Sequence, residues 1–434
     1  MLGQLFEFWR LVQHRTLSPD RLHVLREQKL RAVIRHAYEH VPYYRSLFTS
    51  AGLRPQDIRT LEDLTRIPVT TKEDLRAAGL GQITAQNIDL AQCLRLQTSG
   101  STGKPFSVYL TRSEARTRRL IEFRAILSIG LRAGDRLTVL GPEQAHRSRI
   151  HQRLGLYRCE DISPFLPVED QIRQLQASRP TVLWAYPNRL KAILRETGDR
   201  LSALARPRVL ITSSAPLDGL TEACLRADLS ADIFNFYGAI ETGRIATECA
   251  AHRGLHVTAD HLIVECLADD GTDGPGGLCV ITTLNAFAMP FIRYRLGDLC
   301  KWIDLKCSCG SSFPLIGPPR GREWDMITLP SGKLLPSTPL TFLLTNCDWI
   351  DQFRMIQERT DHLVLQLVFG RTPPVDALPT LRARIEALLR EPVRLDIEGV
   401  ESLRDEGSKF RAFISRLSAG SPSMPSRSQA GKPS

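Results

Sequence analysis

The sequence has no long apolar run, no pattern typical of a secretory signal peptide and no block of basic residues. Its longest uncharged stretch, residues 274–292, contains two prolines, three glycines and an asparagine, which would leave backbone polar groups unpaired in lipid. We therefore expect no membrane span. The first residues, MLGQLFEFWRLVQHR, include a glutamate and no small-residue cleavage site, so a signal peptide is not expected. These absences favour a cytoplasmic protein.

Cysteine is also scarce, with ten residues in 434, most of them alone inside apolar runs. Such thiols are typical of small buried hydrophobic residues in a reducing compartment. Lysine and arginine number 57 against 47 acidic residues, a net charge of +10. Because the arginines are scattered, this excess favours nucleotides or an acidic carrier protein as partners and argues against nucleic acid.

Hydrophobic residues at 42% and charged residues at 24% fit a folded globular chain of two or three domains. Apolar spacing predicts helices over residues 2–11 and 22–38 in a helical lead-in spanning 1–90. We interpret Phe6, Phe8 and Trp9 as a core-packing stripe, with a membrane-surface helix as the alternative. From Cys93 onward, short β-branched runs alternate with helical stretches, which predicts an α/β fold.

A segment rich in proline and glycine follows residue 310 and predicts a linker. We expect a large N-terminal α/β domain over residues 1–317 and a small α+β domain over 318–417. Residues 418–434 lack branched apolar and aromatic side chains, so we expect a disordered tail.

One candidate for phosphate binding lies between two predicted strands, in the sequence TSGSTGKP from Thr98 to Pro105. Its glycines and hydroxyl side chains leave backbone and side-chain donors available for phosphate oxygens. It is not a Walker A loop, because Thr98 and Pro105 occupy positions that require glycine and a hydroxyl residue. A solvated hairpin loop is the alternative.

Two further motifs combine aromatic and acidic residues with glycine. In NFYGAIETG, Tyr237 and Glu241 follow an apolar run and should lie at the carboxyl end of a strand, where ligands collect in α/β sheets. There an aromatic ring can stack on a base and a carboxylate can hold Mg²⁺. In FIRYRLGD, Asp298 just beyond a strand could accept hydrogen bonds from a ribose. A capped turn and an edge-strand salt bridge are the alternatives.

These motifs stand in a fixed order with GREWD at residues 321–325 and GSKFR at 407–411. In this order the chain resembles the adenylate-forming (acyl-AMP) superfamily, specifically its branch of phenylacetate-CoA ligases, CapK proteins and coenzyme F390 synthetases. The likeness covers about residues 4–416. It implies a small C-terminal domain that rotates as a lid, and two half-reactions: ATP and Mg²⁺ convert a carboxylic acid to an acyl-adenylate, and a thiol of CoA or an acyl carrier protein then takes the acyl group.

The resemblance also implies roles for individual residues. Lys104 and Lys409 would be catalytic, with Lys409 reaching the α-phosphate and the carboxylate, and Glu241 would bind Mg²⁺. Tyr237 and Gly238 would border the adenine, while Asp298, helped by Arg322, would take the ribose hydroxyls. The phosphate loop would comprise Ser99, Gly100, Ser101, Thr102, Gly103 and Lys104. The acid would lie near Trp184 to Pro187, Ser213 to Pro216 and Phe236.

Three departures from the family pattern keep other functions open. Ile240 and Leu296 replace threonines, and Trp324 replaces an acidic hinge residue. An enzyme that passes the acyl or AMP group to an amine or hydroxyl, and a nucleotide-binding scaffold with weakened catalysis, are therefore alternatives. The small carboxylic acid is not identified by the sequence, and the apolar N-terminal helix would allow a homodimer.

A zinc site is a separate hypothesis. Cys307 and Cys309 form a close thiol pair, and the segment from Cys249 to His256 supplies a third thiol and two imidazoles. Four such ligands from two loops suit a structural Zn²⁺, and similar loops in CapK-type relatives hold one. We expect Cys249, His256, Cys307 and Cys309 as ligands, with His252 as the competing imidazole.

Overall fold

The computed structural model describes most of the chain in two compact units, Met1–Glu323 and Trp324–Ser434. The domain boundary expected between residues 317 and 318 lies a few residues before this division. The described residues are 2–97, 106–141, 155–198, 200–214, 217, 219–268, 274, 276–319, 326–345, 347, 349–403 and 412–417.

The first unit begins with helices, as the apolar spacing predicts. The Ser18 side chain accepts a hydrogen bond from the backbone of Arg21, and Pro19 occupies the first turn, so both the cap and the fixed φ start the second helix. Leu30 and Tyr44 are fully buried in the core beneath this lead-in. The elements are α1 (Leu2–His14), α2 (Pro19–His40), α3 (Pro42–Ser50), η1 (Pro55–Asp57), η2 (Glu62–Arg66), α4 (Lys72–Ala78), α5 (Leu80–Ile83) and η3 (Leu90–Gln92).

The core-packing interpretation of α1 is wrong for two of its aromatic residues. Phe6 and Trp9 stack on each other and are 61% and 56% exposed. Phe8 instead packs against Phe123, and Leu11 is buried. The helix thus has two apolar faces, of which one contacts the rest of the unit. Among the described residues, no helix is both long and apolar enough to span a bilayer.

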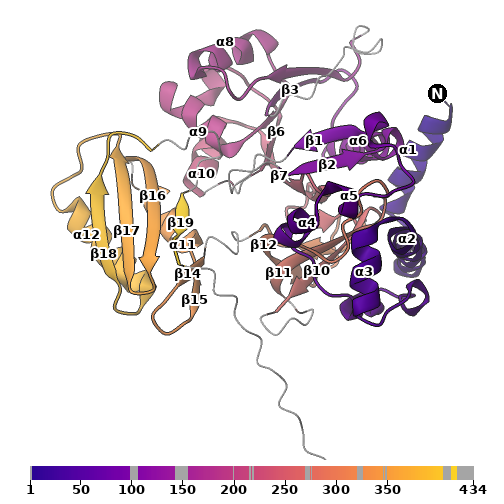
Figure 1. The fold of residues 1–434 in the computed structure, drawn as a ribbon. Helices are drawn as coiled ribbons and strands as arrows, with labels where there is room; N and C mark the ends of the chain where they lie inside the picture. Colours follow the sequence, from indigo (N-terminus) through magenta and orange to yellow (C-terminus); the bar gives the residue numbers. More distant parts are fainter. Residues whose placement is uncertain are drawn as a thin grey trace, which may run out of the picture. The chain divides into compact units, whose positions relative to one another are not determined.

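An eleven-stranded mixed sheet forms the centre of this unit, in the order β10-β11-β12-β13-β9-β8-β7-β6-β5-β3-β4 (Figure 1). Five neighbouring strands are parallel: β3 (Arg136–Leu140), β4 (Arg158–Ile162), β5 (Val182–Ala185), β6 (Val209–Ser213) and β7 (Asp232–Ala239). Their carboxyl ends share one edge of the sheet, which is where ligands bind in α/β proteins.

The remaining strands of the sheet are antiparallel to their neighbours. They are β8 (Gly243–Glu248), β9 (Leu255–Val257), β10 (Leu262–Leu267), β11 (Gly276–Thr283), β12 (Tyr294–Ile303) and β13 (Leu315–Ile316). Asp298 lies inside β12, so its predicted place just beyond a strand is wrong. Gly297, with φ at +85°, and a register shift between Leu278 and Val280 let the strand continue past the expected glycine turn.

Helices cover both faces of the parallel strands. On one face, Ala125 and Ile126 of α6 (Arg112–Ser128) pack against Val182, Val209 and neighbouring residues. On the other face lie α8 (Val168–Ser178), α9 (Pro187–Glu196), η4 (Leu201–Ala203) and α10 (Gly219–Asp228). A separate hairpin pairs β1 (Leu94–Gln97) with β2 (Ser107–Leu110).

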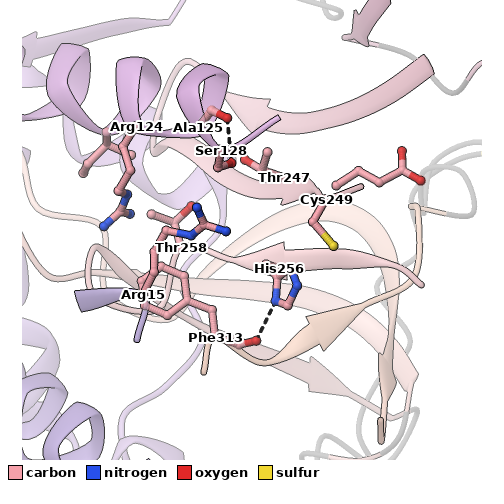
Figure 2. Close-up of a pocket in the computed structure, with 11 residues that line it drawn as sticks. Arg15, Arg124, Ala125, Ser128, Thr247, Cys249, His256, Thr258 and Phe313 are labelled. Carbon is pink, nitrogen blue, oxygen red and sulfur yellow. Dashed lines mark hydrogen bonds between the residues drawn. The ribbon is translucent and has the colours of Figure 1, made fainter. Parts of the chain in front are cut away.

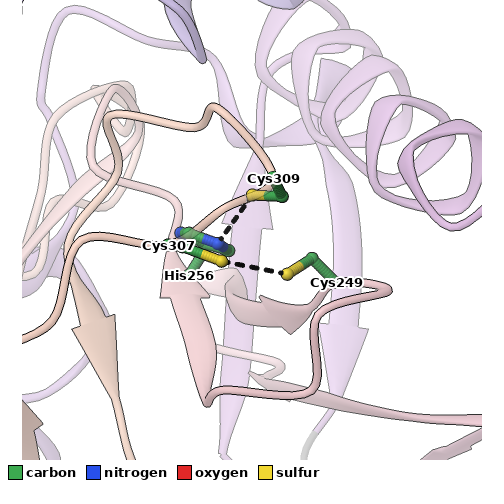
Figure 3. A group of neighbouring side chains, drawn as sticks. All are labelled: Cys249, His256, Cys307 and Cys309. Carbon is green, nitrogen blue, oxygen red and sulfur yellow. Dashed lines mark hydrogen bonds between the residues drawn. The ribbon is translucent and has the colours of Figure 1, made fainter.

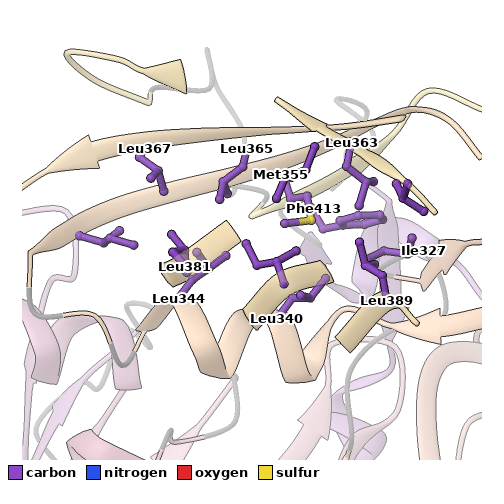
Figure 4. Close-up of a cluster of buried hydrophobic side chains, with 14 of the residues drawn as sticks. Ile327, Leu340, Leu344, Met355, Leu363, Leu365, Leu367, Leu381, Leu389 and Phe413 are labelled. Atoms are coloured by element: carbon purple, nitrogen blue, oxygen red, sulfur yellow. The ribbon is translucent and has the colours of Figure 1, made fainter. Parts of the chain in front are cut away.

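The second unit has its own core between a four-stranded sheet and helices (Figure 4). The sheet order is β18-β17-β16-β19, and Leu363, Leu365 and Leu367, alternating along β17, are fully buried against Leu381 and Ile385 of α12. The period of two on the strand matches a sheet with one buried face. The elements are β14 (Met326–Thr328), β15 (Leu334–Pro336), α11 (Thr338–Thr345), β16 (Ile350–Arg359), β17 (His362–Phe369), α12 (Ala377–Leu389), β18 (Arg394–Gly399) and β19 (Phe413–Ser415).

Candidate active site and metal centre

Glu241 lies in the turn between β7 and β8, at the carboxyl edge of the parallel strands, as predicted. Its side chain is buried, and the residue is 6% exposed. The Lys72 ammonium lies 3.0 Å from its Oε1, and the Tyr294 hydroxyl donates a hydrogen bond of 3.4 Å to the same oxygen. A buried carboxylate needs such partners because desolvation of an unpaired charge is costly. Glu241 thus has both an ammonium group and a hydroxyl donor as partners.

Backbone pairing brings Lys72 to this turn. Thr70 forms an isolated parallel bridge with Tyr294, and the Arg295 amide donates to the Thr70 carbonyl at 2.8 Å. Thr71 then caps α4 through Asp74, so Lys72 starts that helix. This isolated bridge therefore holds the segment before α4 beside the start of β12 and brings Lys72 to a carboxylate far along the sequence.

The backbone of the same turn is fixed from α6. The Arg118 guanidinium donates to the carbonyl oxygens of Ile240 at 2.9 Å and Glu241 at 2.7 Å. Burial lowers the pKa of Arg118 to about 10, so the group stays charged at neutral pH. Gly238 is also necessary here, because a Cβ at this position would lie 2.8 Å from the carbonyl oxygen of Gly243.

Tyr237 and Asp298 meet beneath this edge. The Tyr237 hydroxyl donates a hydrogen bond of 2.6 Å to Oδ2 of Asp298 and also contacts Sγ of Cys279 at 3.8 Å. Burial, followed by the electrostatic interactions with Cys279 and then Asp298, raises the pKa of Tyr237 well above its ordinary value. The phenol therefore remains a donor, and it orients the carboxylate of Asp298 through one of its oxygens.

Two of the departures from the family pattern lie in the described residues. Ile240 is 38% exposed at the tip of the turn. Leu296 packs against two buried clusters, one of which includes Phe291 and Tyr294. Neither side chain displaces the hydrogen bonds of Glu241 or Asp298. Trp324 lies outside the described residues.

The four predicted zinc ligands lie together (Figure 3). One ligand atom from each of Cys249, His256, Cys307 and Cys309 falls within 4.8 Å of the others, and all but Cys309 are buried. Cys249 follows β8, His256 lies on β9, and the two remaining cysteines follow β12. Strand β13 pairs with both β9 and β12 and so holds the two ligand loops side by side.

The imidazole of His256 is already oriented for a metal. Its Nδ1 donates to the carbonyl oxygen of Phe313 at 2.8 Å, which leaves Nε2 facing Sγ of Cys309 at 3.2 Å. In metal sites, a hydrogen bond from the ring nitrogen that does not bind the metal commonly fixes the orientation of the histidine. The competing imidazole, His252, instead bonds Oε1 of Glu248 at 2.9 Å and is outside the cluster.

Burial also sets the protonation of these groups. It lowers the pKa of His256 and raises the pKa of Cys249 to about 12. The imidazole is thus neutral and able to donate a lone pair, while the buried thiol needs a nearby cation to stabilise its thiolate. Three thiols and one neutral imidazole form a donor set that fits tetrahedral Zn²⁺.

A small cavity of about 30 Å³ adjoins the cluster, between Arg15, Arg124, Cys249 and His256 (Figure 2). Such a volume holds about one or two water molecules, so it does not accommodate a nucleotide or an organic acid. The backbone of Arg15 links the N-terminal helix to the ligand loop, because its carbonyl oxygen accepts hydrogen bonds from the amide and hydroxyl of Ser312 at 2.7 and 3.1 Å.

Sequence reasoning missed Lys72 and Arg118, which hold Glu241 and its turn. The only local signal was the Thr71 cap and the lysine after it, and neither indicates a partner so distant in the sequence. Several predicted site residues lie outside the described residues, and their roles stay predictions. They are Ser99, Gly100, Ser101, Thr102, Gly103, Lys104, Arg322 and Lys409.

No family model matches the chain, but curated proteins do. It is 29% identical over 367 residues to a phenylacetate-coenzyme A ligase of Thermus thermophilus, covering 79% of this chain and 80% of the relative. The phenylacetate-coenzyme A ligase of Escherichia coli is 28% identical over 339 residues, covering 74% and 76% of the two chains.

Solved structures confirm the predicted fold class. A 2-hydroxyisobutyryl-CoA ligase in the postadenylation state, in complex with an acyl-AMP, superposes with a TM-score of 0.76 at 20% identity, over 93% of this chain and 92% of that chain. The O-succinylbenzoate coenzyme A synthetase of Bacillus subtilis, in complex with ATP and a magnesium ion, gives 0.52 at 16% identity over 72% and 67%. The resemblance to phenylacetate-CoA ligases found in the motifs is confirmed by the curated relatives, and the solved structures confirm the fold.

Proposed function

Since its curated relatives are phenylacetate-CoA ligases and its fold is that of adenylate-forming acyl-CoA ligases, we propose that this chain is an AMP-forming acid ligase. In the first half-reaction a carboxylate oxygen attacks the α-phosphorus of ATP, and pyrophosphate leaves. In the second, a thiolate of CoA or a carrier protein attacks the acyl carbon, and AMP leaves.

One observation supports this proposal most directly. Tyr237, Glu241 and Asp298 come from two motifs far apart in the sequence, yet Tyr237 bonds Asp298 at 2.6 Å, and Glu241 lies four residues after Tyr237 at the carboxyl edge. Asp298 would accept the ribose hydroxyls, and Tyr237 and Gly238 would border the adenine. This edge of a parallel sheet is the expected place for a nucleotide.

Glu241 fits Mg²⁺, because its carboxylate offers oxygen ligands of the kind that Mg²⁺ prefers and already lies 3.0 Å from one cationic group, the Lys72 ammonium. Bound there, Mg²⁺ would supply positive charge to the phosphates. The remaining catalytic charges in the proposal are Lys104 of the phosphate loop and Lys409 of the second unit, with Arg322 helping Asp298 at the ribose.

Pyrophosphate exchange with ATP and a panel of carboxylic acids tests the first half-reaction. We expect exchange that depends on an acid and on Mg²⁺, and that falls at least ~100-fold in Glu241→Gln. Thr221→Ala, on α10, is the matched control. ATP binding without exchange for any acid would instead favour the nucleotide-binding scaffold suggested by Ile240 and Leu296.

Adding CoA then identifies the acceptor. A thioester product supports the acid–thiol ligase, whereas acid-dependent exchange without a thioester favours transfer to an amine or hydroxyl. A carrier protein bearing a phosphopantetheine thiol is the second acceptor to try, because the basic net charge suits an acidic partner.

We also propose that Cys249, His256, Cys307 and Cys309 hold a structural Zn²⁺. The support is the donor set and the compact geometry, within 4.8 Å, together with the orientation of His256 by Phe313. Elemental analysis of purified protein should find about one zinc per chain. Zinc-free, stable protein from zinc-supplemented cultures would contradict this proposal.

A further inference from the structure

A buried cation lies beside the aromatic residues that the acid is expected to contact. The guanidinium carbon of Arg244, on β8, lies 4.5 Å from the ring centre of Phe236 and 5.4 Å from that of Trp184. The two rings pack edge to face at 5.8 Å, and the Trp184 indole donates to the Ser213 hydroxyl at 2.8 Å. Arg244 is 8% exposed. Arg244, Phe236 and Trp184 thus form a cluster in which a guanidinium group lies against two aromatic rings.

This cluster lies near the carboxyl ends of the parallel strands. Trp184 and Ser213 are at or next to the last residues of β5 and β6, and Phe236 pairs with Ser213. Helix α6 runs opposite to the strands, because Ala125 and Ile126 in its second half pack with residues that begin β5 and β6. Its first half, which holds the Glu241 turn through Arg118, therefore lies at the same edge as the cluster.

Glu122 of α6 satisfies only part of the guanidinium. It accepts hydrogen bonds from Nη2 of Arg244 at 2.6 Å and from Nε at 3.1 Å. Within the described ranges, no residue accepts a hydrogen bond from Nη1. The Arg244 side chain is only 6% exposed, yet Nη1 is not among the fully buried side-chain atoms without a partner, so the small exposed part of the side chain leaves this nitrogen within reach of a ligand. A bound molecule that supplies an acceptor would give this charged donor a hydrogen bond inside the protein.

Arg244 is the buried member of this ion pair, with 6% of its side chain exposed against 25% for Glu122. Apolar residues of similar size usually stabilise a buried position as well as an ion pair does. Here the pair is next to Phe236 and Trp184, which would pack readily against an apolar side chain. Its presence among apolar neighbours at a ligand-binding edge therefore points to recognition of a polar group.

From this geometry we infer that Arg244 is a specificity-determining residue, which selects acids that carry a hydroxyl or carbonyl oxygen away from the reacting carboxylate. Nη1 would donate to that oxygen, and a substrate hydroxyl could donate to Glu122. Because the Arg244–Glu122 pair is neutral overall, a neutral oxygen suits it better than a second carboxylate. An acid with a purely hydrocarbon chain would leave Nη1 unpaired. This inference rests on the proposed adenylation, since it names the class of acid.

Matched acids test the inference. Pyrophosphate exchange is measured with 4-hydroxyphenylacetate against phenylacetate and with 6-hydroxyhexanoate against hexanoate. We expect kcat/KM to be about 10-fold or more higher for the oxygen-bearing member of at least one pair, as for one hydrogen bond to a charged donor. In Arg244→Met the ratio should fall to about one. Equal rates in both pairs for the wild type, or an unchanged ratio in Arg244→Met, would overturn the inference.

Two further variants separate specificity from folding. Glu122→Gln/Arg244→Met removes both charges, so it leaves no unpaired carboxylate, and it should lose the preference while unfolding cooperatively. The control variant Glu222→Gln/Arg226→Met removes an Arg–Glu pair from the surface of α10. It should keep the preference for oxygen-bearing acids. A structural role alone would lower the melting temperature of the first double variant and leave its acid ratio unchanged.

A binding measurement keeps this test distinct from that of the proposed function. The acyl-sulfamoyl adenosines of the same paired acids bind without reacting. The ratio of their Kd values therefore measures the preference for the oxygen-bearing acid without any reaction. If no acid supports exchange but the oxygen-bearing analogue binds about 10-fold more tightly, adenylation is refuted and the role of Arg244 stands. If the paired analogues bind equally, the role of Arg244 is refuted.

Discussion

Tyr237 donates a hydrogen bond of 2.6 Å to Asp298 across a separation of 61 residues. The donor lies on the last parallel strand and the acceptor on an antiparallel strand in the other part of the same sheet. The contact therefore joins the parallel half of the sheet to the antiparallel half beneath the proposed nucleotide. It also fixes the carboxylate before a ligand arrives, which reduces the ordering cost of binding.

We expect Asp298→Ala to raise the KM for ATP by about 10- to 100-fold, because charge-assisted hydrogen bonds contribute ~1.5–3 kcal/mol each. Tyr237→Phe should raise it less, since the carboxylate remains but loses its orienting donor. The measurement is pyrophosphate exchange at varied ATP. Asp304→Ala, at an exposed position just after the same strand, is the control. An unchanged KM in Asp298→Ala would exclude a ribose-binding role.

Lys72 and Glu241 give a second prediction. Lys72→Met removes the cation 3.0 Å from a buried carboxylate, so we expect the ligand-free protein to lose about 1–3 kcal/mol of stability. Mg²⁺ with ATP should restore more stability in this variant than in the wild type, because the divalent ion then has no ammonium to displace. Melting temperatures with ATP, in Mg²⁺ or in EDTA, measure the difference.

Lys301→Met changes an exposed lysine of the same unit and should behave as the wild type. Equal Mg²⁺-dependent shifts for Lys72→Met and the wild type would show that Lys72 and the metal do not act on the same carboxylate.

The sequence predicts the elements that local patterns determine. Four of the five parallel strands, β3, β5, β6 and β7, follow from β-branched runs, and α6 follows from helical spacing, whereas β4 was not predicted. The four clustered Cys and His residues follow from the small number of soft ligands in loops. Contacts that depend on the order of strands in the sheet cannot be predicted from such local patterns. β9 and β13 have three and two residues, too few for any periodicity, yet they bring His256 beside Cys309.

The same limit applies to the partners of Glu241 and Phe236. Lys72 reaches Glu241 through a bridge between Thr70 and Tyr294, and no pattern around the lysine indicates that pairing. Arg244 looks like an ordinary charged residue in the sequence, and only the packing of α6 on the sheet buries it. Residues that belong to a sequence motif were thus predictable, whereas the distant residues that contact them in the fold were not.

His261 gives a prediction about pH. It is buried and neutral, with Nε2 donating to Thr242 and Nδ1 accepting from Asn285, each at 3.0 Å. Burial, followed by the charge of Arg118, lowers the pKa of His261 to about 3. Because this pKa is about 6.5 in the unfolded chain, the unfolded state binds more protons between about pH 3 and 6.5. The stabilising contribution of neutral His261 is complete above that window and is lost as the pH falls through it.

We therefore expect the free energy of unfolding to fall by up to about 1.4 kcal/mol per pH unit from this residue below pH ~6.5. Urea unfolding at about pH 7.5 and about pH 5 measures the slope. His261→Gln should be less stable at the higher pH and show a shallower decline, while His23→Gln, at an exposed position, should match the wild type. A decline of the same steepness in His261→Gln would assign the pH dependence to other groups.

The metal cluster gives the last prediction. His256→Asn should weaken zinc binding by about a hundredfold or more, because it removes one of four ligands from a site that contributes roughly 10–16 kcal/mol. His252→Asn should leave affinity nearly unchanged, since that ring bonds Glu248. Competition with a chromogenic chelator measures both. Zinc removal should also speed hydrogen exchange in residues 12–16, because Arg15 is tied to the ligand loop through Ser312. A greater loss of zinc affinity in His252→Asn than in His256→Asn would reverse the assignment of the imidazole ligand. Unchanged hydrogen exchange at Arg15 would show that zinc does not stabilise the end of the N-terminal helix.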